Sequence, residues 1–386
     1  MFTMAVGHSD DVDADDAITA VIDQCRASLA GLKPQAGILF SAFDSFGPSV
    51  VAAVHEAFPG VTVMGSTSAA EISSTSGFLE DSITLALFAS DIVDVTTGLG
   101  TGLAEDVIAA CRAAANQAMA ATKRDPKVCV VLTETFVVDP QRTLEAMAEA
   151  LPEGVVVVGG TSARRDFVTV TPTSQFRDDV IVDDGIAILL FSGPIAFSTT
   201  VGTGWRAVGA TGTVTKSTYG ALHEIDGRPA ADFVARYLDV TGRATFGNML
   251  SVVEREGDGS YLRAILDADP ESGSVLVAGS IPAGSTIHLT TSDTDDLLEG
   301  TKAALIEAKD AFPTGATPEA ALIFSCAVRK FLLGSRTKVE AEIASSVLGA
   351  SIPIAGTYCY GEIGPIRGAP TSRYFNETFV TLLLGT

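Results

Sequence analysis

Basic residues are scarce in this sequence of 386 residues, where 25 lysines and arginines face 47 aspartates and glutamates for a formal net charge of −22. A phosphate backbone or an anionic membrane surface would repel such a body, so nucleic acid is not an expected partner. Charged residues make up only 19% of the chain and hydrophobic residues 47%, which excludes wholesale disorder. At roughly 150 residues per domain, the length predicts two or three folding units.

Cysteine and histidine are also few. The five cysteines include no C-x-x-C pair, so neither a disulfide framework nor a thiolate zinc site is indicated, and we expect reduced, mostly buried thiols. A three-histidine zinc site would need nearly all of the histidines, whereas haem needs a single axial ligand. Catalytic metal chemistry is therefore not expected, while haem stays open. The four histidines are His8, His55, His223 and His288.

The sequence lacks a secretory signal and any long apolar run. Its first residues, MFTMAVGHSDDVDADD, carry acids where an apolar core of a signal peptide would continue. Apolar stretches such as IAILLFSGPIAF are broken well short of the ~18–20 residues that span a bilayer. We therefore expect a cytoplasmic protein without membrane insertion.

An internal repeat is the most informative feature that is present. A strand, a helix, a strand running into a small-residue turn, and a further strand after a loop recur three times along the chain. The middle strands with their turns read VTVMGSTSAAEI, VVVVGGTSARRD and IPIAGTYCYGEI. Recurrence of one β-α-β-loop-β unit indicates duplication of a supersecondary module.

The strands predict an α/β architecture of mixed sheets, because their continuous runs of Val, Ile and Leu suit strands covered on both faces. We expect each middle strand to end at a glycine, Gly65, Gly159 or Gly356, and to expose backbone N–H groups at its carboxyl end. Ligands bind at that edge in open α/β sheets. The composition changes to Gly, Thr and Val near residue 200, which predicts two domains, 1–200 and 201–386, built from related units.

Two segments of the second domain carry further structural signals. The stretch 274–292 contains a Pro-x-Gly turn and predicts a pair of strands. The stretch 293–311 predicts a helix with an acidic first turn.

Several enzyme motifs are absent or incomplete. The sequence has no G-x-x-x-x-G-K-[ST] and no G-x-S-x-G, and the glycines from Gly98 lack the third member of G-x-G-x-x-G. His223 begins like a zincin helix, but Gly227 stands where the second histidine is needed. The hydroxyl cluster ending at Ser68 has no histidine in a local motif, so turn-forming hydroxyls are favoured over a nucleophile.

The C-terminal segment is the most specific part of the sequence. It contains IFSCAVRKFLLG, then GTYCYGEIGPIRG, then RYFNETFVTLLLG. These motifs resemble the C-terminal FIST domain, and GSTSAAEI followed by DSITLALF resembles the N-terminal FIST domain. The segment VTKSTYGALHEIDGRPAADF is similar to the inter-domain segment of the family, so the resemblance extends from about residue 30 to the end.

The resemblance implies a bacterial sensory module that binds a small ligand such as an amino acid. Family members are often fused to histidine kinases, chemotaxis receptors or cyclic-dinucleotide enzymes, or encoded near them. Because the FIST pair occupies the chain, we expect signalling through a separate partner, a histidine kinase among the candidates. Some members are haem proteins that sense nitric oxide, and a histidine ligand here would be His223 or His288.

Acids follow two of the three turn glycines. Glu71 and Glu362 each stand six residues after the turn glycine, whereas the second copy has Arg165 at that spacing. Such a difference between copies is expected when one pocket is specialised, although solvated turn charges would give the same pattern. We favour that alternative for Glu71 and Arg165, and a binding role for Glu362.

Four further residues of the C-terminal motif are candidate ligand contacts. Arg329 suits a bidentate contact to a carboxylate ligand, or equally a structural ion pair, with Glu362 as its candidate partner. Tyr358 and Tyr360 offer flat faces with hydroxyl groups, as core and edge tyrosines also do. Cys326 and Cys359 end neighbouring strands, and buried inert thiols are the default for such residues. The candidate ligand-binding set is Arg329, Glu362, Tyr358, Tyr360, Cys326, Cys359, Ser68 and Glu71.

Three functions follow from these residues. The first is a non-enzymatic sensor with its pocket at strand carboxyl ends of the C-terminal domain or at the domain interface. The second is a haem-dependent gas sensor that regulates a histidine kinase. The third is an enzyme that uses Cys359 or Ser68 as a nucleophile.

Overall fold

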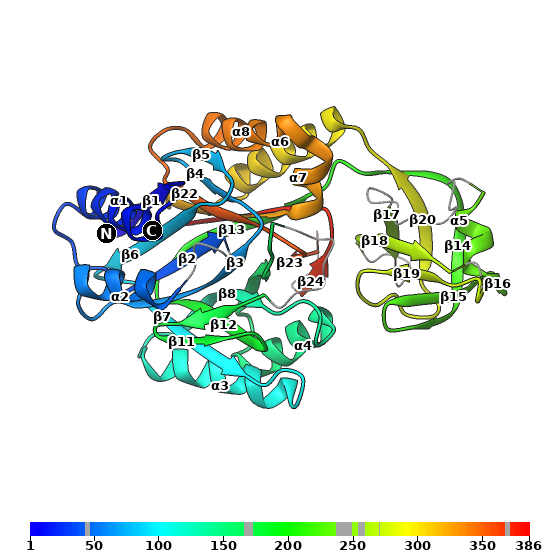
Figure 1. The fold of residues 1–386 in the computed structure, drawn as a ribbon, viewed down its shortest axis with the longest axis horizontal. Coiled ribbons are helices and arrows are strands. Elements are labelled where there is room, and N and C mark those ends of the chain that lie inside the picture. Colours follow the sequence, from blue (N-terminus) through cyan, green and yellow to red (C-terminus); the bar gives the residue numbers. More distant parts are fainter. Residues whose placement is uncertain (43–46, 166–172, 237–248, 254–258, 270, 367–370) are drawn as a thin grey trace.

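The computed structural model describes residues 1–42, 47–165, 173–236, 249–253, 259–269, 271–366 and 371–386. Its strands form four sheets, three of six strands and one of seven. Figure 1 shows the seven-stranded sheet, coloured green to yellow, on one side of the molecule and the helices α1 to α4 and α6 to α8 around the other three.

The three six-stranded sheets share one plan, and each contains four strands from one unit of the chain. Within a unit the second and third strands are parallel, and the remaining pairings of these four strands are antiparallel. The first unit contains β1 (Phe2–Ser9), α1 (Ala14–Leu29), β2 (Ala36–Ala42), α2 (Pro48–Ala57), β3 (Thr62–Ser68) and β6 (Ile83–Ser90). The second contains β7 (Asp94–Thr101), α3 (Val107–Ala120), β8 (Pro126–Thr133), α4 (Pro140–Ala150), β9 (Val156–Thr161) and β12 (Gly185–Ser192).

The third unit follows the same order, with a large insertion after its first strand. It contains β13 (Ala196–Gly202), α6 (Thr294–Asp310), β21 (Pro318–Cys326), α7 (Ala327–Leu333), the short 3₁₀ helix Gly334–Arg336, α8 (Lys338–Leu348), β22 (Ile354–Cys359) and β25 (Phe379–Gly385). The helix expected at 293–311 is α6, which Asp293 caps by accepting from two backbone N–H groups. The α/β class and the three related units are therefore confirmed.

Each unit also forms a short hairpin, which pairs with the sheet of another unit. The hairpins are β4 (Glu71–Ser73) with β5 (Gly77–Leu79), β10 (Gln175–Arg177) with β11 (Val180–Val182), and β23 (Glu362–Pro365) with β24 (Ser372–Phe375). Strand β4 pairs with β22, β10 with β3, and β23 with β9. The three units are thus linked in a closed cycle, in which each unit completes a neighbour's sheet.

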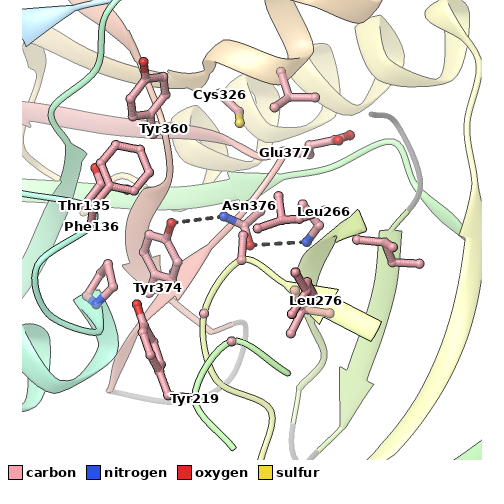
Figure 2. A pocket seen from close by; sticks show the side chains of 18 residues that line it. Thr135, Phe136, Tyr219, Leu266, Leu276, Cys326, Tyr360, Tyr374, Asn376 and Glu377 are labelled. Atoms are coloured by element: carbon pink, nitrogen blue, oxygen red, sulfur yellow. Dashed lines mark hydrogen bonds between the residues drawn. The ribbon is translucent and has the colours of Figure 1, made fainter. Parts of the chain in front are cut away.

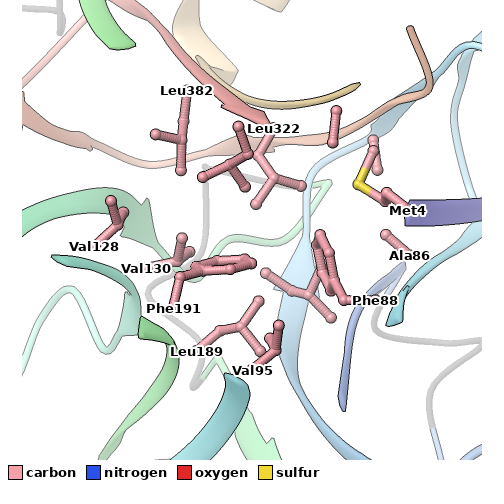
Figure 3. Packing of buried hydrophobic residues seen from close by; sticks show 14 of the residues in the cluster. Met4, Ala86, Phe88, Val95, Val128, Val130, Leu189, Phe191, Leu322 and Leu382 are labelled. Atoms are coloured by element: carbon pink, nitrogen blue, oxygen red, sulfur yellow. The ribbon is translucent and has the colours of Figure 1, made fainter. Parts of the chain in front are cut away.

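The inner faces of the three sheets meet in one hydrophobic core, while helices cover their outer faces. Figure 3 shows this core, to which Met4 and Phe88 come from the first unit, Val130 and Phe191 from the second, and Leu382 from the third. On the outside, α1 and α2 cover the first sheet, α3 and α4 the second, and α6 and α8 the third. Burial on both faces explains the continuous apolar runs in these strands.

The insertion forms the seven-stranded sheet, and its hydrophobic cluster also includes Ile366 and Phe375 of the third unit. It contains β14 (Arg206–Thr218), β15 (Ala221–Ile225), β16 (Arg228–Pro229), α5 (Ala230–Val234), β17 (Met249–Val253), β18 (Tyr261–Ala268), β19 (Val275–Val277) and β20 (Thr286–Thr291). The strands predicted at 274–292 are β19 and β20, but the prediction that they pair with each other is wrong, because β19 joins β18 and β15 while β20 joins β14 and β17.

The turn glycines act differently from the expectation. Strands β3, β9 and β22 continue past Gly65, Gly159 and Gly356 to residues 68, 161 and 359. A Cβ at these glycines would lie 1.9, 2.0 and 2.4 Å from the carbonyl oxygens of Leu39, Val131 and Ile323 on the neighbouring strand. The glycines therefore allow close approach of two strands, and the prediction that they end the strands is wrong.

The division at residues 1–200 and 201–386 stays a prediction. Residue 200 lies within β13, which pairs along its whole length with the last strand, β25. In the described part of the chain, no helix is both long enough and apolar enough to cross a membrane.

Candidate functional site

Two buried glutamates occupy the same place in the first and third units. Glu71 begins β4 opposite Thr357, and Glu362 begins β23 opposite Gly160, at corresponding register positions. Glu362 accepts from the backbone N–H of Thr378 at 2.9 Å, from its hydroxyl at 2.8 Å and from the Cys359 thiol at 3.5 Å. Each carboxyl is therefore held inside the protein at the junction of two sheets.

Glu71 has matching partners in its own unit. The hydroxyls of Ser68 and Ser82 both donate to its carboxylate, and these two serines correspond to Cys359 and Thr378. His8, which lies 2.9 Å from Ser82 and 2.8 Å from Ser73, extends this network. No sequence motif linked His8 to these serines, and the pairing of β1 with β6 places His8 beside Ser82.

The counterpart of these glutamates in the second unit is Gln175, and the comparison with Arg165 made from sequence spacing is wrong. Gln175 begins β10 opposite Ser66, at the same register position. Its amide donates to Ser162 at 2.8 Å, and its oxygen accepts from the N–H of Gly185 at 3.1 Å. A longer connection in the second unit shifts the count, and Arg165 instead pairs with Asp81 at the surface.

Burial governs the ionisation of this network. It raises the pKa of Glu71 to about 7 and that of Glu362 to about 8, despite the hydrogen bonds that favour the charged forms. Burial also lowers the pKa of His8 to about 4, so its imidazole is neutral. Ser68, Glu71 and Glu362 are each at most 1% exposed, so the prediction that Glu71 is a solvated turn charge is wrong. The role of these three residues as ligand contacts stays a prediction.

Arg329 lies in a second buried network, and the candidate pairing with Glu362 is wrong. Its partner is Glu340, which lies 2.7 Å from Nη2 and 3.1 Å from Nε, and neither side chain is exposed. The guanidinium also donates to the carbonyls of Thr203 and Leu297. These contacts occupy its donors with protein groups, while its role as a ligand contact stays a prediction.

Tyr358 belongs to the same network, and the free cysteines Cys326 and Cys359 are buried on the same two strands. The Tyr358 hydroxyl donates to Glu340 at 2.9 Å. Cys326 and Cys359 are opposite each other on β21 and β22, as the repeat suggested. Burial and the neighbouring Glu362 raise the pKa of both thiols well above its usual value, so both cysteines are held as poorly nucleophilic thiols.

A pocket of about 380 Å³ lies between the inserted sheet and the strand ends of the second and third units. Figure 2 shows Phe136 and Tyr374 on one wall, Leu266 and Leu276 on the other, and Tyr219 at one end. Of the predicted set, Cys326 and Tyr360 line this pocket. The other pocket-lining residues are Thr135, Pro140, Gly220, Ala264, Ile265, Val277, Ala278, Gly279, Val328, Asn376 and Glu377.

Two polar side chains of the pocket, Asn376 and Glu377, come from the segment between β24 and β25. Asn376 donates to the Tyr374 hydroxyl at 3.1 Å and accepts from the N–H of Ala264 at 3.4 Å, which ties the third unit to the inserted sheet. Glu377 is fully buried, and neither of its carboxylate oxygens has a hydrogen-bond partner among the described residues. Burial raises its pKa to about 8, against the attraction of Arg329.

The sequence interpretation missed Asn376, Glu377 and the contribution of the inserted sheet. One signal for Glu377 was available, because an acid stands two residues before the first apolar residue of the last strand in every unit. These acids are Asp81, Asp184 and Glu377. The wall from β18 and β19 had no such signal, since no motif connects those strands with the repeat.

Two family profiles cover most of the chain. The FIST N domain matches residues 35–228 and the FIST C domain matches residues 230–365. The chain belongs to the FIST family. FIST domains are small-ligand sensory domains of signalling proteins, and the pocket lies where residues from both matched regions meet.

Curated relatives of this FIST protein include uncharacterized proteins from two mycobacteria. One from Mycobacterium tuberculosis is 27% identical over 238 residues, 58% of this chain and 60% of the relative. One from Mycobacterium bovis is 27% identical over 228 residues, 56% of this chain and 57% of the relative. The chain thus spans about 60% of the length of these relatives or slightly less.

Solved structures with some likeness are cyanuric acid hydrolase from A. caulinodans and PurLQS from Thermotoga maritima. The hydrolase is 10% identical with a TM-score of 0.35, over 99% of both chains. PurLQS is 14% identical with a TM-score of 0.24, over all of this chain and 72% of the other. Likenesses this weak carry no argument about activity.

The described residues do not fit a haem or a metal at the pocket. No histidine is among the described residues that line it. His223 lies 2.9 Å from the hydroxyl of Thr218 on the inserted sheet, and His288 is on β20. Within the described ranges, no group of three or more His, Cys, Asp or Glu side chains could hold a metal ion.

Proposed function

We propose that this FIST protein is a non-enzymatic sensor that binds a small metabolite, of the amino acid or related class, in the pocket between the inserted sheet and the strand ends. The observation that carries the proposal is the pocket itself. It combines apolar and aromatic walls with a few polar groups at strand ends, which is the usual composition of a small-molecule site.

The position of the pocket suggests how binding is reported. Its walls come from two bodies, the inserted sheet and the three-sheet core, so a ligand that contacts both favours the arrangement in which they are closed. A ligand shifts such an equilibrium only by its differential affinity for the two arrangements. The output then reaches a separate signalling protein, with a histidine kinase as the first candidate.

A ligand screen tests the binding proposal. Amino acids, amines and neutral analogues are added to the full chain, and melting temperature and calorimetric heat are measured. Ala278→Phe fills the pocket and abolishes binding of any hit, while Ala104→Phe, on an exposed turn of the second unit, leaves it unchanged. A hit that binds Ala278→Phe as tightly as the parent chain contradicts the site, and absence of any hit contradicts the sensor.

The enzyme alternative has less support from the geometry. Its two candidate nucleophiles, Cys359 and Ser68, are at most 2% exposed, and the raised pKa of the Cys359 thiol disfavours the thiolate. We therefore expect native protein to react with a thiol reagent more slowly than a free model thiol. Fast modification of Cys359 would revive this alternative.

A further inference from the structure

Glu377 is the one acidic or basic residue among the described residues that line the pocket, and its backbone is unusual. Its φ of 55° lies in the left-handed region, which residues with a side chain adopt infrequently. Asp81 holds the corresponding position in the first unit with a φ of 52°. The first and third units thus share this conformation, and they differ in what their carboxylates contact.

The corresponding acids of the other two units have protein partners. Asp81 pairs with Arg165, which the second unit supplies. Asp184 accepts from the N–H of Ala104 at 3.1 and 3.3 Å. Glu377 has no hydrogen-bond partner among the described residues, although it is more deeply buried than Asp81.

Three groups near Glu377 influence its charge. Arg329 and the indole of Trp205 favour the carboxylate, whereas burial and Glu362 disfavour it. Arg329 already pairs with Glu340, and the indole nitrogen of Trp205 makes no hydrogen bond of ordinary geometry with the described residues. A buried carboxylate without a paired cation is costly, so a cation that reaches it is bound strongly.

The other residues of the pocket limit which functional groups such a ligand can have. No lysine, arginine or histidine is among the described residues of the pocket, so the carboxylate of an amino acid has no cation to meet. Four aromatic rings, those of Phe136, Tyr219, Tyr360 and Tyr374, offer an apolar surface. The net charge of −22 also attracts cations from solution.

We propose that the ligand is a primary amine on an apolar, ring-sized body, and that its ammonium group pairs with the carboxylate of Glu377. This inference rests on the pocket being the ligand site. The sequence suggested that Arg329 binds a carboxylate of the ligand. In this proposal Glu377 instead binds an amine of the ligand.

Isothermal titration of the full chain with 2-phenylethylamine, tryptamine and the neutral isostere 2-phenylethanol tests the proposal. We expect the amines to bind at least tenfold tighter than the alcohol. Below pH 8 binding must release the proton of Glu377, so amine affinity rises about tenfold per pH unit up to that point. Glu377→Gln loses both the preference and the pH dependence, whereas Asp81→Asn, the corresponding change in the first unit, keeps both.

The outcomes separate this inference from the proposed function. Equal binding of amine and alcohol, blocked by Ala278→Phe, overturns the amine proposal and supports the pocket. A preference for amines that persists in Glu377→Gln also overturns it, because another group then binds the ammonium. If neither amines nor alcohol bind while another compound binds outside the pocket, both proposals fail.

Discussion

Arg329 and Glu340 show how neighbours decide the role of a single charged residue. Glu340 accepts from Arg329, from the hydroxyls of Thr301 and Ser325, and from Tyr358. These residues come from α7, α8, β21 and β22, so the ion pair links the four elements. All of them are buried, and neither charge of the pair contacts solvent. The arrangement is typical of a structural ion pair.

Replacing Arg329 with methionine should therefore destabilise the fold. Glu340 would remain buried without its cation, and a loss of about 3–5 kcal/mol is expected. Arg329→Met combined with Glu340→Gln should regain part of this loss, because the unpaired charge is removed. Denaturant unfolding measures both, and a stability of Arg329→Met equal to that of the parent chain would argue against the buried pair.

Gln175 allows a test of the repeated carboxyl site. Gln175→Glu would give the second unit the acid that Glu71 and Glu362 supply in the others, with Ser162 and Gly185 as donors. Since burial disfavours the charged form, we expect little change in the free energy of unfolding at pH 5 and a loss of about 1–3 kcal/mol at pH 8. A loss of the same size at both pH values would indicate a steric cause.

At the scale of elements, Arg263 fastens the inserted sheet to the core. Its side chain is 1% exposed and donates to the carbonyls of Tyr374 at 2.7 Å and Ser280 at 3.1 Å. The guanidinium carbon also lies 4.4 Å from the ring centre of Tyr261 and 5.2 Å from that of Tyr374. Strand β18 is thereby held against β24 next to the pocket.

Loss of this contact should loosen the insertion selectively. Arg263→Met keeps the apolar stem but removes the donors and the contact with the rings. Hydrogen exchange in β18 and β19 should accelerate at least tenfold, while β21 and β25 keep their protection. Uniform acceleration across all four sheets would show that the residue supports the global fold instead.

The elements themselves were largely predictable, and their pairings were not. Three copies of one pattern identified the last three of the four main strands of each unit and the helix between the first two of these, because hydrophobic runs and breaker residues are local signals. The first strand and the first helix of each unit were not part of that pattern. The hairpins were not predicted, because their strands are only three or four residues long and pair with strands of other units. Gln175 was missed because counting from Gly159 fails across a longer connection. Glu377 was missed because the pocket that it lines is formed by the third unit together with the second unit and the inserted sheet.

At the scale of the whole molecule, three buried acids and a surplus of negative charge act together. The pKa values of Glu71, Glu362 and Glu377 are raised to about 7, about 8 and about 8. The contribution of these three carboxyls to the free energy of unfolding is fully present below pH 4.5, where they are protonated in both the folded and the unfolded chain. It is lost as pH rises toward 8, because the unfolded chain ionises first.

Stability should therefore fall between pH 5.5 and pH 7.5, by about 2 kcal/mol or more. His8, with its pKa lowered to about 4, acts oppositely below pH 6.5, which reduces the slope on the acid side. Urea unfolding at fixed ionic strength measures the trend. The triple variant Glu71→Gln, Glu362→Gln, Glu377→Gln should flatten it, and an equally steep slope in that variant would assign the effect to surface charge alone.

The closed cycle of hairpins determines how the chain can be divided. A fragment ending near residue 228 would contain β4 and β9 but lack β22 and β23, their partners. Each half would then present unpaired strand edges, which promote self-association. The two FIST halves are thus obligate complements: expressed separately they should aggregate, and expressed together they should reassemble into one stable particle.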